Sequence, residues 1–142
     1  MIDSRKANQA DLDYVCAHPL EGAVKVYPKL ICPEDNACTY TVDGKIMCVG
    51  GVMVLWSGVG EMWMILTEDC KELADGTEIA LKIRHELKVF MSENNLWRVQ
   101  ASVRTDFPLA ERLTLALGFK QEGLMKKYLP DGSDAYLYAR VL

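Results

Sequence analysis

The stretch 38–67 constrains the fold most strongly, because turn-forming residues divide it into short segments with the apolar periodicity of β-strands. Segments 39–42 and 45–49 flank the pair Asp43-Gly44, which readily supplies the positive φ angles of a type I′ turn. Strands joined by so short a connection pair in antiparallel fashion. The sequence therefore predicts a β-hairpin at this point.

Two further strands are predicted directly after this hairpin. We expect Gly50-Gly51 to let the second strand bend or bulge before it continues through 52–56, because glycine tolerates the backbone angles of a bulge. A turn at 57–60 leads into 61–67, which is apolar at nearly every position. Continuous apolar character is typical of a strand that is covered on both faces, and we expect this of 61–67.

Tryptophan and methionine side chains are expected to serve packing. The three tryptophans fall in predicted strands, where a large ring commonly lies in the core or at its rim. The methionines of these strands and of the following helix can fill irregular gaps in a core. The residues concerned are Trp56, Trp63, Trp97, Met47, Met53, Met62, Met64 and Met91.

Helices and strands alternate in the second half of the chain. The clearest helix is predicted at 77–94, where apolar residues recur at helical spacing and end at a pair of asparagines. A strand at 97–103, a short helix at 108–117 and a terminal hairpin of 119–128 and 135–141 follow. The apolar stripe of the long helix consists of Ile79, Ala80, Ile83, Leu87, Phe90 and Met91.

The N-terminal stretch 6–16 is predicted to form a short strand and then a helix. Asn8 can cap this helix, with Asp11 at the third helical position. The complete order mixes hairpins, which pair antiparallel, with strand–helix–strand units, which favour parallel pairing. The sequence therefore predicts an α/β fold with a mixed β-sheet and helices on its faces. One domain, 1–142, is expected at this length.

Composition excludes several classes of function. The formal net charge of −4 argues against nucleic acid as a partner. No apolar run reaches the roughly 18 residues that a membrane-spanning helix needs, and the first residues lack the apolar core of a signal peptide. We therefore expect a cytoplasmic protein with no nucleic-acid partner and no membrane span.

The cysteines argue against a metal site. Their spacings fit no common zinc pattern, no Cys-x-x-Cys motif occurs, and only two histidines are present. We expect reduced cysteines that serve as small hydrophobic residues, and no bound metal. The five cysteines are Cys16, Cys32, Cys38, Cys48 and Cys70.

The order of elements, together with particular residues, resembles the Gcn5-related N-acetyltransferase (GNAT) family. The stretch 110–123 contains Leu117-Gly118-Phe119 and looks like the family's last helix and the strand entry that follows it. The strand 62–67, with its turn and long helix, resembles the family's central cofactor-binding unit. The resemblance implies a three-layer domain with a mixed, twisted sheet flanked by helices, and it extends over the whole chain.

This resemblance implies an enzyme that transfers acetyl from acetyl-CoA to an amine by direct attack in a ternary complex. In the family the fourth and fifth strands splay apart around the thioester, and main-chain amides before the central helix bind the diphosphate. Glu61 matches the position of the family's general base, and Thr114 the position of its proton-donating tyrosine. The residues implied to bind the cofactor are Leu66, Thr67, Asp75, Gly76, Thr77 and Glu78.

The residues also leave a second hypothesis open. In its cofactor loop the family has Gln or Arg at the position of Leu73 and a second glycine at the position of Glu78, and this sequence has neither. Asp75 and Glu78 have the spacing of a capping box, and the acid-rich stretch 67–78 would repel a diphosphate. A threonine hydroxyl is also a far weaker acid than a phenol. The alternative is a GNAT-like interaction or structural module that does not bind CoA.

A second likeness, to small GNAT-like proteins of short-tailed phages, bears on partners. It is carried by the run 63–67, the charged helix after it and Leu96-Trp97. Some of those proteins are minor virion components, so the alternative places the chain in a virion. The acceptor amine, on a small molecule or a protein, is not specified by the sequence. Edge strands of the terminal hairpin could pair with a second subunit to form a homodimer.

Overall fold

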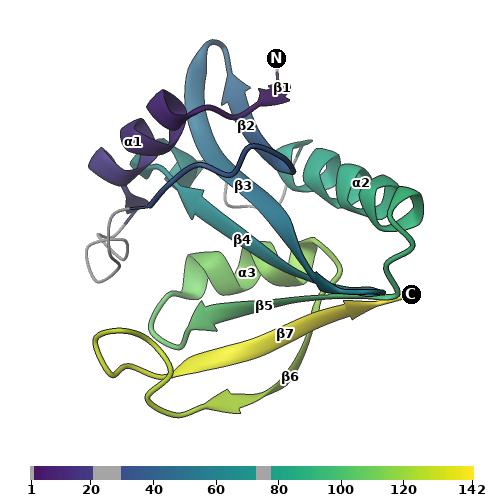
Figure 1. The fold of residues 1–142 in the computed structure, drawn as a ribbon. Helices are drawn as coiled ribbons and strands as arrows, with labels where there is room; N and C mark the ends of the chain where they lie inside the picture. Colours follow the sequence, from purple (N-terminus) through teal and green to yellow (C-terminus); the bar gives the residue numbers. More distant parts are fainter. Residues whose placement is uncertain (1, 21–29, 73–77) are drawn as a thin grey trace. The chain divides into compact units, whose positions relative to one another are not determined.

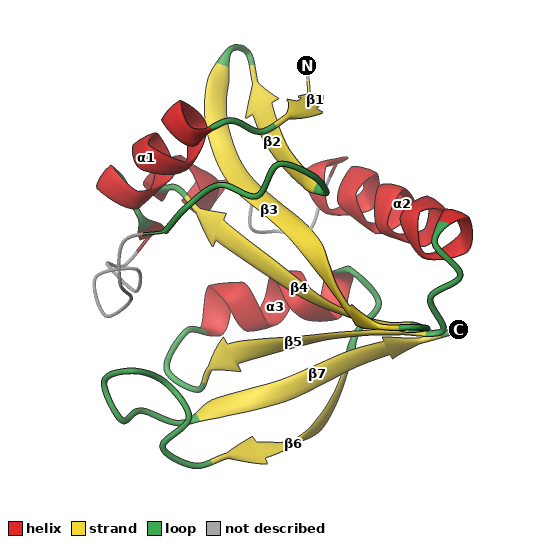
Figure 2. Cartoon of the chain, viewed as in Figure 1, coloured by secondary structure: helices red, strands yellow, loops and turns green. Residues whose placement is uncertain are grey.

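The structure is a computed structural model that describes residues 2–20, 30–72 and 78–142. Strands predominate among the described elements, and α2 is longer than the helices α1 and α3 (Figure 2). The elements are β1 Ile2–Lys6, α1 Gln9–Ala17, β2 Ala37–Val42, β3 Lys45–Trp56, β4 Val59–Leu66, the 3-10 helix η2 Glu68–Glu72, α2 Glu78–Glu93, β5 Arg98–Arg104, α3 Pro108–Ala116, β6 Lys120–Met125 and β7 Ala135–Val141.

The described strands form one seven-stranded sheet in the order β1-β2-β3-β4-β5-β7-β6. The ladders β1–β2, β2–β3, β5–β7 and β6–β7 are antiparallel, and β4–β5 is parallel. The parallel pair requires a crossover, which α2 provides between β4 and β5 (Figure 1). The predicted α/β fold with a mixed sheet is confirmed.

The chain divides into two compact units. Unit 1 comprises Met1–Val52 and Trp63–Leu73, and unit 2 comprises Met53–Met62 and Ala74–Leu142. The strands β3 and β4 each contribute residues to both units. The single domain expected from the length stays a prediction, and each unit is described by itself below.

The core of unit 1 lies beneath α1. Leu12 and Val15 of this helix are buried, and they cluster with Ala7, Ala37 and Val49. Leu12 and Val15 lie three residues apart, so they project from one face of the helix. Half-buried apolar side chains extend this cluster: Cys16, Leu30, Cys32, Ile46, Trp63 and Ile65.

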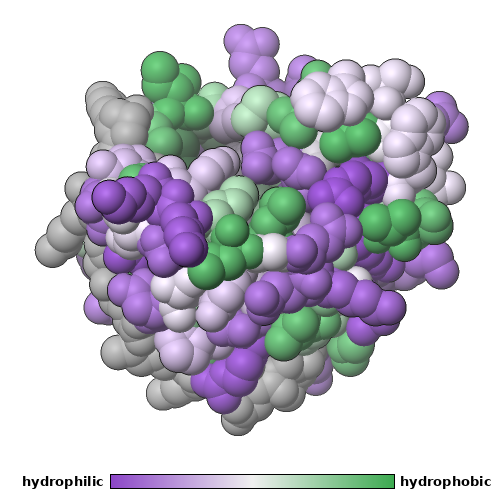
Figure 3. Space-filling model, turned by 90° about the horizontal axis from the view of Figure 1, so that it is seen from below, coloured by the Kyte–Doolittle hydropathy of each residue, from purple (hydrophilic) through white to green (hydrophobic). Residues whose placement is uncertain are grey.

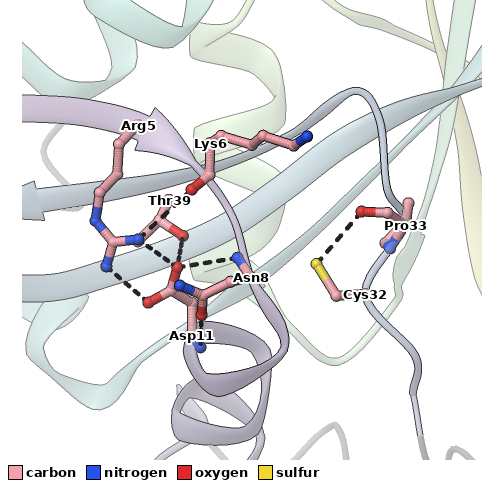
Figure 4. Close-up of polar contacts among 7 residues, drawn as sticks. All are labelled: Arg5, Lys6, Asn8, Asp11, Cys32, Pro33 and Thr39. Atoms are coloured by element: carbon pink, nitrogen blue, oxygen red, sulfur yellow. Dashed lines mark hydrogen bonds and ion pairs between the residues drawn. The ribbon is translucent and has the colours of Figure 1, made fainter.

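Within unit 1, a network of polar side chains joins the start of α1 to the neighbouring strands (Figure 4). Asn8 and Asp11 form the predicted capping box, in which the Asp11 main-chain N–H donates to Asn8 Oδ1 at 2.9 Å and the Asn8 N–H donates to Asp11 Oδ2 at 3.1 Å. The Arg5 guanidinium donates to both oxygens of Asp11, at 2.6 and 2.7 Å. The hydroxyl of the buried Thr39 donates to Asp11 Oδ2 at 2.8 Å. Asp11 therefore joins β1, β2 and α1.

The β2–β3 hairpin confirms the predicted turn and has no bulge at Gly50-Gly51 in its ladder, whereas the predicted bend at these glycines stays a prediction. Asp43 and Gly44 have φ angles of 50° and 82°, as a type I′ turn requires. The register shift occurs between Tyr40 and Thr41 and not at the two glycines. A Cβ atom at Gly51 would come within 2.1 Å of the Asn36 carbonyl oxygen, so this glycine permits close approach of main chains.

Unit 2 is built around α2, α3 and the strands β5 and β7. The predicted stripe of α2 is buried at Ile79, Ala80, Ile83, Leu87 and Met91, whereas Phe90 is half-buried. The Arg140 guanidinium of β7 donates to the carbonyl oxygens of Arg84 in α2 at 3.1 Å and Leu117 at 3.3 Å. One side chain of β7 thus bridges main-chain acceptors from two helical segments.

Exposure contradicts part of the predicted packing. Met53, Trp56 and Trp97 are exposed, and β4 is half-buried over most of its length and not covered on both faces. Trp97 precedes β5, and its ring lies directly over Gly58, where an added Cβ would come within 2.0 Å of an indole carbon. Gly58 also has a φ of +86°, so glycine is required there for both reasons.

Candidate functional site

The parallel ladder between β4 and β5 is short. It joins three residue pairs, of which the last is Glu61 with Gln100. The strand β5 continues to Arg104, and β7 pairs with it along its whole length. Among the described residues, the main-chain groups of β5 beyond Gln100 therefore have a ladder partner on the β7 side only. The end of this ladder in unit 2 is the candidate site.

Polar side chains follow one face of β5 in unit 2. Arg98, Gln100 and Arg104 alternate with the buried Val99, Ala101 and Val103, because successive strand residues point to opposite faces. Glu61 lies opposite Gln100 in the ladder, so its half-buried carboxylate shares the polar face. This alternation was visible in the sequence, but its polar members were not singled out there as site residues.

Arg98 organises the polar side chains beside Glu61. Its Nε donates to Gln100 Oε1 at 3.2 Å, and its two terminal nitrogens donate to the Glu122 carboxylate at 3.0 and 2.6 Å. The hydrogen bond to Glu122 raises the pKa of Arg98 and, in turn, lowers the pKa of Glu122. The Arg98–Glu122 pair is therefore charged on both sides, and Gln100 is held at the ladder end next to Glu61.

Leu66 and Thr67 lie at the end of β4 in unit 1. Leu66 is half-buried, whereas Thr67 has no exposed surface. The Thr67 N–H donates to the Met47 carbonyl oxygen at 2.9 Å, and its hydroxyl lies 3.0 and 3.1 Å from the carbonyl oxygens of Ile46 and Met47. The donors of Thr67 are thus used by β3, and a cofactor contact through them would have to replace these bonds.

The turn before α2 is only partly described. Asp75, Gly76 and Thr77, predicted to bind the diphosphate, lie outside the described residues, as does the predicted capping box of Asp75 with Glu78. Glu78 is the exposed first residue of α2. A carboxylate in the first turn interacts favourably with the helix dipole. Its side chain would need to point away from a bound diphosphate.

Thr114 occupies the middle of α3, where its hydroxyl donates to the Ala110 carbonyl oxygen at 2.7 Å. This bond within the helix satisfies the hydroxyl locally. On the neighbouring strand β7, the Tyr138 hydroxyl donates to Glu111 Oε1 of α3 at 2.9 Å. Burial, together with the hydrogen bond to Glu111, raises the pKa of Tyr138 to about 12. The Thr114 hydroxyl is thus engaged within α3, and Tyr138 holds its proton tightly.

The cysteines carry no sign of a nucleophile or a metal site. No disulfide joins the five cysteines, and burial raises the pKa of Cys70 to about 11 and that of Cys48 well above its ordinary value. Within 2–20, 30–72 and 78–142, no group of three or more His, Cys, Asp or Glu side chains could hold a metal ion. Within the same residues, no helix is long and apolar enough to cross a membrane.

The sequence matches no family model and no curated protein, but solved structures match the fold. A GNAT-family acetyltransferase from Bacillus anthracis has a TM-score of 0.75 at 17% identity, covering 99% of this chain and 94% of that one. The ribosomal-protein-S18-alanine N-acetyltransferase from Escherichia coli has a TM-score of 0.70 at 17% identity, with the same coverage of 99% and 94%. A ribosomal-protein acetyltransferase in complex with coenzyme A has a TM-score of 0.63 at 16% identity, covering 75% of this chain and 61% of that one.

These likenesses confirm the fold expected from Leu117-Gly118-Phe119 and the central strand–helix unit. The first two extend over nearly the whole chain and nearly the whole of the matched protein. At 17% identity the similarity lies in the arrangement of the elements, and a shared fold does not carry a shared activity with it. The activity has to be argued from the residues of the site.

Proposed function

We propose that this protein transfers an acetyl group from acetyl-CoA to an amine by direct attack. The observation that carries the proposal is the early end of the β4–β5 ladder at Glu61 and Gln100. Parallel neighbours normally bond along their shared length, because an unpaired buried main-chain group is costly. Main-chain groups of β5 that this ladder does not use are what an extended ligand such as pantetheine needs for binding.

Glu61 would act as the general base. An amine attacks only as the neutral species, so its proton has to be removed before or during bond formation. A half-buried carboxylate at the end of the ladder can accept that proton directly or through one water molecule. Gln100, held by Arg98, would position the same water through its amide.

Departure of the thiol needs little help from the protein. A thiolate, whose thiol has an ordinary pKa of about 8.5, is a better leaving group than an amide anion or an alkoxide. The Thr114 hydroxyl donates a hydrogen bond to the Ala110 carbonyl oxygen, and the pKa of Tyr138 is raised to about 12, so neither is a ready acid. We propose that the thiolate is protonated by solvent and that Thr114 has a structural role in α3.

The second candidate is a GNAT-like interaction or virion-associated module that does not bind CoA. The observation that favours it is that groups predicted to bind the cofactor or to donate a proton already form hydrogen bonds within the protein. The Thr67 donors bond to β3, and the Thr114 hydroxyl bonds within α3. The loop residues Asp75 and Glu78, together with Glu68 and Asp69 of the preceding segment, would in addition repel a diphosphate.

A thermal-shift measurement with acetyl-CoA separates the two candidates. Ligand at about 100 times its dissociation constant stabilises the folded state by roughly 2.7 kcal/mol, which raises the Tm by roughly 5–10 °C for a chain of this size. Desulfo-CoA, which lacks only the thiol, should give a similar shift, whereas ATP at the same concentration should give a much smaller one. No shift at millimolar acetyl-CoA would contradict the transferase and favour the module.

Turnover is then measured as release of CoA from acetyl-CoA in the presence of amine acceptors. Polyamines, aminoglycosides and peptides with a free N-terminus cover the small-molecule and protein classes of acceptor. Because the chain has five free cysteines, CoA should be quantified after removal of the protein and not by a thiol reagent added to the reaction. An acetyl-CoA-dependent Tm shift without turnover on any acceptor would indicate a binding module that has kept its cofactor.

A further inference from the structure

Hydrophilic and hydrophobic side chains are interspersed over the face of the molecule shown in Figure 3. Scattered apolar residues are normal on a protein surface and need no partner. Charged side chains of one sign that lie together without a counter-charge are more informative, because they attract ligands of the opposite charge. Unit 2 contains one such pair of side chains.

The arginines of unit 2 differ in whether a carboxylate faces them. Arg98 pairs with Glu122, and Arg104 pairs with two aspartates. Among the described residues, Arg84 of α2 and Arg140 of β7 form no ion pair with a carboxylate. A guanidinium stays charged throughout the physiological pH range, so these two positive charges lack a counter-charge.

The two guanidinium groups converge on Gly118, directly after α3. A Cβ atom at Gly118 would lie 3.4 Å from Arg140 Nε and 3.6 Å from Arg84 Nε. The two Nε atoms are therefore separated by no more than the sum of these distances. Gly118 has a φ of +95°, a conformation that favours glycine, so this position places no side chain of its own between the two groups.

Each guanidinium uses only part of its donors. Arg84 Nη1 donates to the Ala116 carbonyl oxygen at 3.3 Å. Arg140 Nη1 donates to the carbonyl oxygens of Arg84 and Leu117, at 3.1 and 3.3 Å. Because a guanidinium has five N–H donors, the Nε and Nη2 groups of both arginines remain without an acceptor among the described residues. Arg84 is exposed and Arg140 is half-buried, so a ligand can reach both.

A role as a helix cap accounts for only part of this arrangement. The Ala116 and Leu117 carbonyl oxygens lie at the end of α3, where a cation is favourable and can bond to the last carbonyl groups. A second guanidinium beside the first has a cost, since burial and the charge of Arg84 lower the pKa of Arg140. Capping requires neither this repulsion nor the four unused Nε and Nη2 groups.

The surroundings of Arg84 on α2 add positive charge and no negative charge. Side chains three and four positions apart are neighbours on a helix surface. The described residues at these positions from Arg84 are Ala80, Leu81, Leu87 and Lys88. No carboxylate on this side of α2 therefore competes for the guanidinium, and the exposed Lys88 strengthens the positive field.

We propose that Arg84 and Arg140 bind a phosphoryl group, with each guanidinium donating to a different oxygen. Arginine donates to phosphoryl oxygens at about 2.7–2.9 Å, and a tetrahedral group presents oxygens toward donors on two sides. A carboxylate has both oxygens in one plane and suits the fork of a single guanidinium. The pair of positive charges also matches the charge of about −1.5 to −2 that a phosphomonoester carries at pH 7. None of these residues is assigned to acetyl transfer, so the proposal does not rest on that activity.

Titration of the full chain with inorganic phosphate locates the site. Amide 1H–15N spectra are recorded at constant ionic strength, because added salt by itself screens charges. We expect saturable shifts at 84, 117–119 and 140, with a dissociation constant on the order of 1 mM. Small shifts that do not saturate would leave the arginines as a helix cap only and overturn the proposal. Saturable shifts confined to 78–80 would also overturn it, and they would assign phosphate to the start of α2, where the cofactor is proposed to bind.

Substitutions at Arg84 test whether its guanidinium binds the phosphoryl group. Arg84→Gln should raise the dissociation constant for phosphate at least about 10-fold, because it removes one of the two charged donors. Arg84→Lys keeps the charge but loses the fork, so its loss should be smaller. Because Arg84 is exposed, both variants should fold, and circular dichroism checks this. If Arg84→Gln fails to fold, Arg84→Lys makes the test, and unchanged affinity in the folded variants would overturn the proposal.

The matched control is Lys82→Gln. It removes one positive charge from the same helix at a side chain that pairs with Glu86, and a residue two positions from Arg84 faces another side of the helix. The dissociation constant for phosphate should change less than about two-fold, because a charge beyond the site is largely screened. Equal weakening by Lys82→Gln and Arg84→Gln would assign binding to overall charge and overturn the proposal.

Two further probes identify the class of ligand. Glycerol 3-phosphate that binds more tightly than inorganic phosphate would assign the site to the phosphoryl group of a small metabolite, and the reverse order would assign it to the free ion. Acetate at the same ionic strength should bind at least about 10-fold more weakly than phosphate, because it carries less charge and fewer oxygens. Equal affinity for acetate would overturn the assignment to a phosphoryl group.

Discussion

The polar residues of the two units differ in burial and, with it, in what they can do. In unit 1, Asp11 is buried, and both of its oxygens accept hydrogen bonds from Arg5, Asn8 and Thr39. In unit 2, the pair of Arg98 and Glu122 is open to solvent, and Glu61 is half-buried beside it. A buried, fully bonded carboxylate stabilises a fold, whereas an accessible one is free to exchange protons with a substrate.

The largest effect is expected at Glu61. We predict that Glu61→Gln lowers kcat about 10²–10⁴-fold, the usual contribution of a general base, and leaves the Tm nearly unchanged because the residue is only half-buried. CoA release from acetyl-CoA measures kcat, and thermal denaturation measures the Tm. Equal activity of the variant and the unmodified chain would remove Glu61 from the mechanism.

Asp11 should give the largest effect on stability and none on turnover per folded molecule. Asp11→Ala removes the acceptor of the Arg5 guanidinium, the Thr39 hydroxyl and the Asn8 N–H together. Thr39 is fully buried and would be left without this partner, so we expect a loss of about 2–4 kcal/mol in the free energy of unfolding. Urea denaturation measures it. A loss below about 1 kcal/mol would mean that the network is not the stabilising centre of unit 1.

These two residues illustrate what local sequence patterns could predict. The capping box of Asn8 and Asp11 and the turn at Asp43-Gly44 follow from residues that lie next to one another, and the structure confirms both. The bonds from Arg5 and Thr39 to Asp11 join residues separated by up to 28 positions, and they went unpredicted. Residues that are close in the sequence determine caps and turns, whereas side-chain bonds between distant residues depend on how the elements that carry them pair and pack.

In the candidate site, too, some features were predicted from the sequence and others depend on pairing between distant segments. Glu61 was singled out because it matches the position of the general base in the family that the sequence resembles, but its neighbour Gln100 became apparent only from the parallel register. Gly50-Gly51 was assigned a bend or bulge because glycine tolerates the backbone angles, and the close approach of the Trp63 and Asn36 carbonyl oxygens became apparent only from the structure. Exposure of Trp56 and Trp97 could not be foreseen either, because it depends on where neighbouring strands end. Each of these features depends on contacts between segments that are far apart in the sequence.

The pH dependence of stability sharpens the contrast between the units. Hydrogen bonds from Arg5 lower the pKa of Asp11 below its unfolded value of about 3.9. The unfolded chain therefore binds more protons than the folded one near this pH, so the contribution of Asp11 is fully present above pH ~4 and is lost as the pH falls through the lowered pKa. Denaturation from pH 6 to pH 2 should show a smaller acid-induced loss in Asp11→Ala. An identical loss in both chains would assign it to other carboxylates.

Tyr138 should behave as a packing residue of unit 2. Tyr138→Phe removes the hydrogen bond to Glu111 but keeps the buried ring, so we expect a loss of about 1 kcal/mol in the free energy of unfolding. Catalysis should not change, because the hydroxyl, with its pKa raised to about 12, is not assigned a proton transfer. A fall in kcat larger than about 10-fold with an unchanged fold would instead make this hydroxyl the acid that protonates the thiolate.

The smallest effect is expected at Glu122, which tests whether accessible charge in unit 2 serves stability at all. Glu122→Gln keeps the size of the side chain and weakens a pair that faces solvent, so the free energy of unfolding should hardly change. Arg98 keeps its bond to Gln100, and that bond becomes the main restraint on the amide beside Glu61. We therefore expect a change in KM or kcat of no more than a few-fold, and the comparison with Glu61→Gln separates a carboxylate that positions its neighbours from one that accepts a proton. A loss of stability as large as that of Asp11→Ala would show that exposure does not distinguish the two polar regions.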